Sequence, residues 1–115
     1  MKKSSNRMVR INDEIAQTTA QLIRSEMTDP RIGTVVSVLR AETTTDLKFC
    51  KIYVSLLDGD HTKTMDALAK AAGFVRKRLA ETLNLRNTPE ITFVYDDSIV
   101  HAMRMHQLIA EVNRK

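Results

Sequence analysis

The chain has few residues of the kinds that cross-link a fold or interrupt it. Its 115 residues include one cysteine, three glycines, two prolines and no tryptophan. Cys50 has no second cysteine with which to form an internal disulfide, and one thiol falls short of a zinc site. We therefore expect a protein of a reducing compartment, cytoplasmic in location and without a metal or another cofactor.

Long apolar runs are also absent. Charged residues interrupt every segment, so no window approaches the roughly 20 apolar residues of a membrane-spanning helix. Lys2 and Lys3 are followed by the polar residues 4–7, where a secretory signal would have a continuous apolar stretch. These patterns predict a soluble protein that is neither exported nor bound to a membrane.

Apolar and charged side chains are what the chain does contain. Hydrophobic residues make up 43% of it, which is enough to form one core at this length. There are 18 lysines and arginines against 14 aspartates and glutamates, and the resulting net charge of +4 favours polyanionic partners. No repeat or linker divides the chain. We predict one domain over residues 1–115, flexible at residues 1–6.

The spacing of apolar residues predicts the order helix, strand, strand, helix, strand, helix. Steps of three and four residues indicate the helices, and β-branched or alternating residues indicate the strands. The helices are predicted at residues 8–27, from 62 or 64 to 83, and from 97 or 98 to 115, and the strands at residues 35–42, 47–57 and 91–95. We expect an α+β domain in which the helices pack on one face of a three-stranded sheet. The last helix is expected to pack there through its apolar side.

Gly73 lies in the middle of the second predicted helix. Leu68, Ala72 and Val75 keep their helical spacing on both sides of it. A glycine inside a helix costs about 1 kcal/mol relative to alanine. We therefore interpret Ala71, Ala72 and Gly73 as a kink or a place of close approach.

No group of residues forms a recognisable catalytic motif. The three glycines are too scattered to build a phosphate-binding loop. Asp97, Ser98 and His101 are the residue types of a hydrolase triad, but no nucleophile elbow or oxyanion loop accompanies them. We predict that the protein is not an enzyme. One alternative is a small metal-dependent nuclease or hydrolase that acts on RNA through Asp96, Asp97 and His101, and another is a protein-binding adaptor.

Positive charge is concentrated in two segments of the chain. Residues 1–27 contain five basic and three acidic residues, and residues 61–90 contain six and three. Phosphate contact is one interpretation of these clusters, and an ordinary solvated helix face is the other. The few aromatic residues lie outside basic strands, so any RNA binding should rely on backbone charge and shape rather than on base stacking.

Counted as two helices that meet at Gly73, the second predicted helix gives the order helix, strand, strand, helix, helix, strand. This order resembles the type II K homology (KH) fold, in which nucleic acid lies along the junction between the two middle helices. The usual Gly-x-x-Gly loop of that fold is missing. Ala71, Ala72 and Gly73 stand in its place, and this helix-kink-helix variant resembles the bacterial ribosome-binding factor A family. Also similar to that family are Arg10, Ile11, Glu14, Val54, Met103 and Arg104, and the segments 29–33, 46–47, 72–76 and 89–99.

This resemblance implies a type II KH-like domain and a non-enzymatic ribosome assembly factor. Such a factor binds the free 30S ribosomal subunit and its 16S rRNA, assists late maturation and 5′-end processing of that RNA, and matters most in the cold. The resemblance also implies a bacterial, cytoplasmic monomer with no DNA partner. Many family members have a charged tail after the last helix, whereas this sequence stops at Lys115. Functions that rest on such a tail are not carried over.

The charge clusters supply the candidate contacts to RNA. We expect Gly73 to let the backbone approach RNA, and Arg31 to contact it from the loop after the first helix. Phosphate contacts are expected from Arg7, Arg10, Lys70, Arg76, Lys77, Arg78 and Arg86. For Arg10 and Arg31, ion pairs within the chain are the other interpretation.

Overall fold

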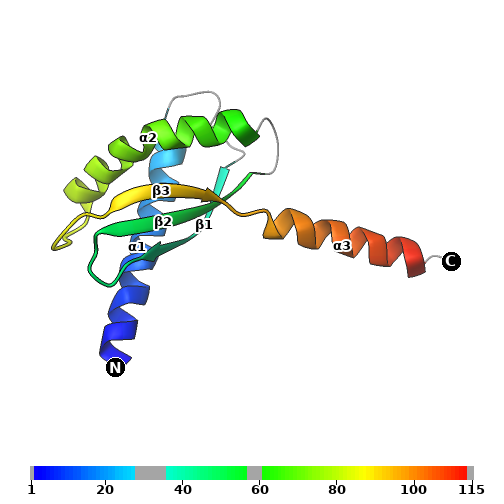
Figure 1. Cartoon of the computed structure of the whole chain (residues 1–115), viewed down its shortest axis with the longest axis horizontal. Helices are drawn as coiled ribbons and strands as arrows, with labels where there is room; N and C mark the ends of the chain where they lie inside the picture. Colours follow the sequence, from blue (N-terminus) through cyan, green and yellow to red (C-terminus); the bar gives the residue numbers. More distant parts are fainter. Residues whose placement is uncertain (1, 28–35, 57–60, 114–115) are drawn as a thin grey trace.

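The helices and strands follow one another in the predicted order (Figure 1). The computed structural model describes residues 2–27, 36–56 and 61–113. Its helices are α1 (Lys2–Ser25), α2 (His61–Thr82) and α3 (Ser98–Asn113), and its strands are β1 (Val36–Thr43), β2 (Phe49–Leu56) and β3 (Glu90–Tyr95). Arg31 and the predicted loop at 29–33 lie outside the described residues.

The three strands form one sheet with β2 at its centre. β1 pairs with β2 antiparallel and β3 pairs with β2 parallel, so that Ile52 lies between Ala41 and Phe93. Parallel neighbours need a crossover connection, and α2 supplies it. The turn between β1 and β2 lies between the strands predicted at 35–42 and 47–57, although β2 begins at Phe49 rather than at Leu47.

One face of the sheet carries both α1 and α2. Along β2 the alternate residues Cys50, Ile52, Val54 and Leu56 are almost completely buried, and burial raises the pKa of the Cys50 thiol. α1 packs against β1, and α2 packs against β3. The helices contribute, among others, Ile15, Leu68, Val75 and Leu79 to this core. The predicted α+β architecture, with helices on one face of a three-stranded sheet, is confirmed for α1 and α2.

α2 continues as one helix through Gly73, and its ribbon bends about midway in Figure 1. A Cβ atom built on Gly73 would meet no other atom within 4 Å. Gly73 is also exposed. Packing within the described chain therefore does not require a glycine at this position.

The last helix departs from the expectation that it packs on the sheet. α3 projects away from the sheet in Figure 1, and every residue from 101 to 112 is exposed. Met103, Ile109 and Val112 were expected to be covered, yet more than half of the surface of each is accessible. Apolar periodicity indicates that a helix has an apolar side, but it does not indicate that a partner surface lies within reach. Here only Asp96 and Asp97 connect β3 to α3.

Asp96 ties the start of α3 to the open face of the sheet. Its Oδ1 atom accepts a hydrogen bond from the backbone N–H of Ser98 at 2.8 Å, and its Oδ2 atom accepts one from Nη1 of Arg40 at 3.1 Å. The Arg40 guanidinium carbon in turn lies 4.1 Å from the centre of the Tyr53 ring. Side chains of β1 and β2 thus hold the point at which α3 leaves the sheet.

Thr19 gives a test of the core. Its side chain is completely buried, and its hydroxyl has no hydrogen-bond partner among the described residues. We expect Thr19→Val to raise the free energy of unfolding by about 1 kcal/mol, because a buried hydroxyl without a partner destabilises a fold. Thr18→Val, at the half-buried neighbour, should change it by less than about 0.5 kcal/mol. Urea denaturation measures both values, and a less stable Thr19→Val protein would contradict the expectation.

The start of α3 gives a prediction about pH. The bonds to Ser98, followed by the bond to Arg40, lower the pKa of Asp96 from its ordinary value of 3.8. Such a carboxylate stabilises the folded state above its ordinary pKa, and this stabilisation is lost as the pH falls through the lowered pKa. We expect Arg40→Gln to raise the pKa of Asp96, and the remaining bonds to Ser98 to keep it below 3.8. NMR titration of the carboxyl carbon measures this, with Arg24→Gln as the control that leaves it unchanged.

Candidate RNA-binding surface

The outward side of α2 carries two of the predicted lysines. Lys70 and Lys77 are both exposed, and their spacing of seven residues places them on one side of the helix, about 10 Å apart along its axis. Phe74 lies between them and is 40% exposed, and the bare backbone of Gly73 lies beside it. We call Lys70, Gly73, Phe74 and Lys77 the α2 stripe. It offers two ammonium groups, an aromatic ring and an open stretch of backbone to the same partner.

Phe74 is the residue that sequence reasoning missed. The sequence predicts RNA binding without base stacking, because no aromatic residue lies in a basic strand. A helix, however, also brings residues four and three apart onto one side, and Phe74 is four residues after Lys70 and three before Lys77. Applying that spacing to the cationic positions would have identified the ring as part of the same surface.

Arg76 and Arg78 already have partners within the chain. Nε and Nη2 of Arg76 both donate to the backbone carbonyl of Thr88, each at 3.2 Å, and so fasten the connection between α2 and β3. Arg78 joins α2 to the end of α1, because Nη2 lies 3.0 Å from Glu26 and Nη1 lies 2.9 Å from Glu81. These carboxylates, Glu26 first, raise the pKa of Arg78. Arg76 remains exposed, whereas the charge of Arg78 is compensated locally.

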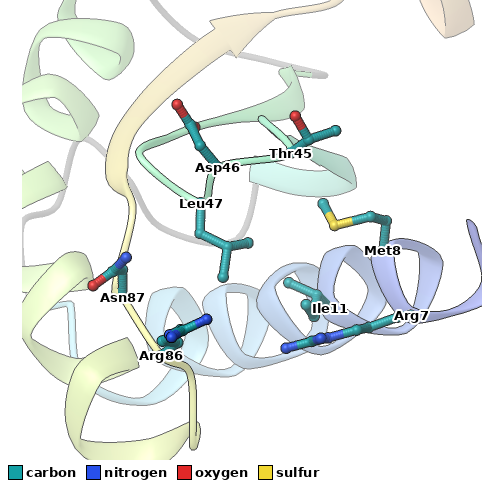
Figure 2. Close-up of a pocket in the computed structure, with 8 residues that line it drawn as sticks. All are labelled: Arg7, Met8, Ile11, Thr45, Asp46, Leu47, Arg86 and Asn87. Carbon is teal, nitrogen blue, oxygen red and sulfur yellow. The ribbon is translucent and has the colours of Figure 1, made fainter. Parts of the chain in front are cut away.

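The other predicted contacts lie away from the α2 stripe. Arg7 and Arg10 are exposed on the first half of α1, and Arg86 is exposed in the connection between α2 and β3. Arg7 and Arg86 line the same pocket (Figure 2). No ion pair holds any of these three arginines within the described part of the chain. The structure therefore places Lys70, Gly73 and Lys77 in the α2 stripe and Arg7 and Arg86 at this pocket, and Arg10 and Arg76 belong to neither.

Among residues 2–27, 36–56 and 61–113, no three His, Cys, Asp or Glu side chains are placed to hold a metal ion. No helix in these ranges is long and apolar enough to cross a membrane. Asp96, which belongs to the alternative nuclease site, uses its carboxylate to hold Arg40 and the start of α3.

Comparison with known proteins decides the family. Residues 7–109 match the family model described as ribosome-binding factor A. The chain belongs to the ribosome-binding factor A family. A relative of that name from Lachnospira eligens is 45% identical, over 97% of this chain and 88% of the relative. Another from Clostridioides difficile is 41% identical, over 97% of this chain and 89% of the relative. The resemblance inferred from the sequence is confirmed.

Solved structures of the family have the same KH-like fold. The solution structure of a Thermotoga maritima protein described as a putative ribosome binding factor A has a TM-score of 0.68 and 30% identity, and covers 76% of this chain and 85% of its own. The crystal structure of ribosome-binding factor A from Thermus thermophilus has a TM-score of 0.70 and 19% identity, and the match covers 76% of this chain and 94% of that structure's chain. Coordinates of the Thermus thermophilus factor were also fitted into an electron cryo-microscopy map of its complex with 30S, and these match with a TM-score of 0.65.

Proposed function

We propose that the chain is a non-enzymatic assembly factor that binds the small ribosomal subunit through its 16S rRNA. The observation that carries the proposal is the α2 stripe, with two exposed lysines that have no ion pair among the described residues and with the exposed backbone of Gly73, on a chain of the ribosome-binding factor A family. A family member from Thermus thermophilus has been fitted into a map of a 30S complex, which supports the same partner for this chain. The site of action is then the bacterial cytoplasm.

In this proposal the α2 stripe contacts the RNA backbone. Lys70 and Lys77 are far enough apart to reach separate phosphate groups, and each contact releases counterions from the RNA. Gly73 lets a sugar or phosphate come closer to α2 than any side chain would allow. The Phe74 ring is available to stack on an unpaired base, which adds a contact that double-stranded RNA cannot supply. Arg76 adds an exposed positive charge next to Lys77 on α2, and Arg10 is a separate exposed cation on α1.

Maturation of 16S rRNA then follows from differential affinity rather than from catalysis. A protein that binds one RNA conformation more tightly shifts the population toward it, and moving an equilibrium from 1:99 to 99:1 requires about 5.5 kcal/mol of difference. Low temperature stabilises incorrect base pairs, so such a factor is most needed in the cold. We propose that this shift supports late maturation and 5′-end processing, and that the chain acts as a monomeric single domain.

The role of the lysines is tested by reversing their charge. We expect Lys77→Glu to lower the affinity for free 30S subunits about tenfold in low salt, which corresponds to about 1.4 kcal/mol. Lys51→Glu makes the same charge change on the exposed face of β2 and should lower it less than twofold. Sedimentation with purified 30S subunits measures the affinity, and thermal unfolding should be unchanged for both variants. Equal losses for Lys51 and Lys77 would show that net charge, and not the α2 stripe, determines binding. No loss at Lys77 would favour a contact made through ribosomal protein.

Replacing Gly73 should change the stability of the fold and the affinity for 30S subunits in opposite directions. Because no atom lies within 4 Å of the position of a Cβ, Gly73→Ala should raise the free energy of unfolding by up to about 1 kcal/mol through its better helix propensity. We expect the same variant to bind 30S subunits at least fivefold more weakly, because the methyl group occupies space that the RNA backbone needs. Urea denaturation and sedimentation measure the two effects. A variant that is more stable and binds normally would remove Gly73 from the proposed contact.

A further inference from the structure

A pocket lies at the end of the molecule where the β1–β2 turn meets α1. Its volume is about 340 Å³. Its walls are the first half of α1, the turn at residues 45–47 and the connection between α2 and β3 (Figure 2). The lining residues are Arg7, Met8, Ile11, Thr45, Asp46, Leu47, Arg86 and Asn87. We call it the Arg7–Arg86 pocket.

Two arginines from opposite walls of this pocket face each other. Figure 2 shows the side chains of Arg7 and Arg86 extending toward one another in front of α1. Neither forms an ion pair among the described residues, although Arg40 and Arg78 each hold two carboxylates. Two like charges that converge without a counter-charge repel each other, so the arrangement does not serve the fold. An anion placed between them would be held by both guanidinium groups.

The nearby carboxylate of Asp46 does not supply that anion. Figure 2 shows it pointing away from the two arginines. It accepts a hydrogen bond from the Thr44 hydroxyl at 2.7 Å and one from the backbone N–H of Lys48 at 3.1 Å. These bonds, the one from Thr44 first, lower the pKa of Asp46. The carboxylate is therefore used to build the turn, and it forms no ion pair with Arg7 or Arg86 in the described part of the chain.

The floor of the pocket is apolar. Ile11 and Leu47 belong to the core and expose less than a tenth of their surface, so the half-buried Met8 is the main apolar side chain that a ligand would meet. Leu47 has a φ of 61°, a left-handed conformation that a leucine rarely adopts. The hydrogen bond from its N–H to the Thr44 carbonyl at 2.9 Å helps to hold it there, and Figure 2 shows its side chain pointing down toward α1. A small inorganic anion would need no such floor, whereas the ring of a base or sugar would lie on it.

We propose that the Arg7–Arg86 pocket binds one unpaired nucleotide of RNA, with the phosphate between the two arginines and the base or sugar on the apolar floor. This inference rests on the proposed function and names a second contact, separate from the α2 stripe. The volume lies at the lower end of the range of about 300–1,000 Å³ for small-molecule sites, which suits one nucleotide. Duplex RNA keeps its bases stacked and paired, so only a single-stranded segment fills the pocket.

The neighbouring surface provides a path for the rest of the strand. A second hollow of about 430 Å³ shares Leu47 and Asn87 with the pocket and is also lined by Lys48 and Phe49. Phe49 is 55% exposed. A strand that leaves the pocket across Asn87 therefore meets two more cations, Lys48 and Arg76, and the Phe49 ring, together with the carboxylate of Glu90.

Binding of short RNAs to the full chain tests the pocket. The probes are a fluorescent single-stranded hexanucleotide and a blunt-ended RNA duplex, and the competitors are 5′-AMP and inorganic phosphate. We expect Arg7→Gln and Arg86→Gln each to weaken hexanucleotide binding at least fivefold. Arg24→Gln, which removes an exposed arginine at the other end of α1, should weaken it less than twofold. The double variant should also reduce the slope of log affinity against log salt by about 0.7.

The competitors and the 30S subunit separate the possible outcomes. 5′-AMP should displace the hexanucleotide at concentrations at least tenfold lower than inorganic phosphate does. Equal competition by the two would overturn the nucleotide assignment and leave an anion site only. Duplex binding as tight as hexanucleotide binding, or unchanged binding by both arginine variants, would also overturn it. Sedimentation of the unaltered chain with 30S subunits tests the proposed function separately. A chain that binds 30S while the pocket variants bind the hexanucleotide normally would refute the pocket alone.

Discussion

Burial of one face of β2 is the interaction on which the rest of the structure depends. Ile52 and Val54 are fully buried in the middle of the sheet, under α1 and α2. Burying an aliphatic side chain of this size contributes about 1.5–3 kcal/mol. Because β3 is parallel to β2, α2 must cross the sheet between them, and this crossing presents the outward side of α2 to solvent. The position of the α2 stripe is therefore a consequence of how the core closes.

The basic residues divide into those that hold the fold and those that do not. Arg40, Arg76 and Arg78 each connect two segments that are distant in sequence. Their guanidinium groups form hydrogen bonds or ion pairs within the chain, so replacing one of these arginines changes the structure as well as the charge. Lys70, Lys77, Arg7 and Arg86 have no such use in the described chain. Net charge alone does not distinguish the two groups, because the distinction depends on which carboxylates and carbonyls the fold brings within reach.

Local sequence patterns predicted the helices and strands well, but they could not predict which distant segments are in contact. Alternation along β2 and helical spacing through Gly73 lie within one segment, so both are visible in the sequence. The partners of Arg78 are different: Glu26 is 52 residues away, and nothing in the spacing indicates that the end of α1 meets α2. The Arg7–Arg86 pocket has the same origin, since its walls come from three separate parts of the chain. The exposure of α3 could not be predicted, because helical spacing shows that a helix has an apolar side but not whether another part of the chain packs on that side.

The isolation of α3 also affects how the molecule unfolds. The radius of gyration is 16.4 Å, against about 13–14 Å for a compact domain of this length, and the protruding helix accounts for part of the excess. A lone helix of 16 residues is marginal in water, because its own backbone bonds barely offset the entropy of ordering it. The sheet and its two covering helices complete their hydrophobic core without it. Amide hydrogens in α3 should therefore exchange with solvent through fraying of that helix alone, long before the cooperative melting of the remainder.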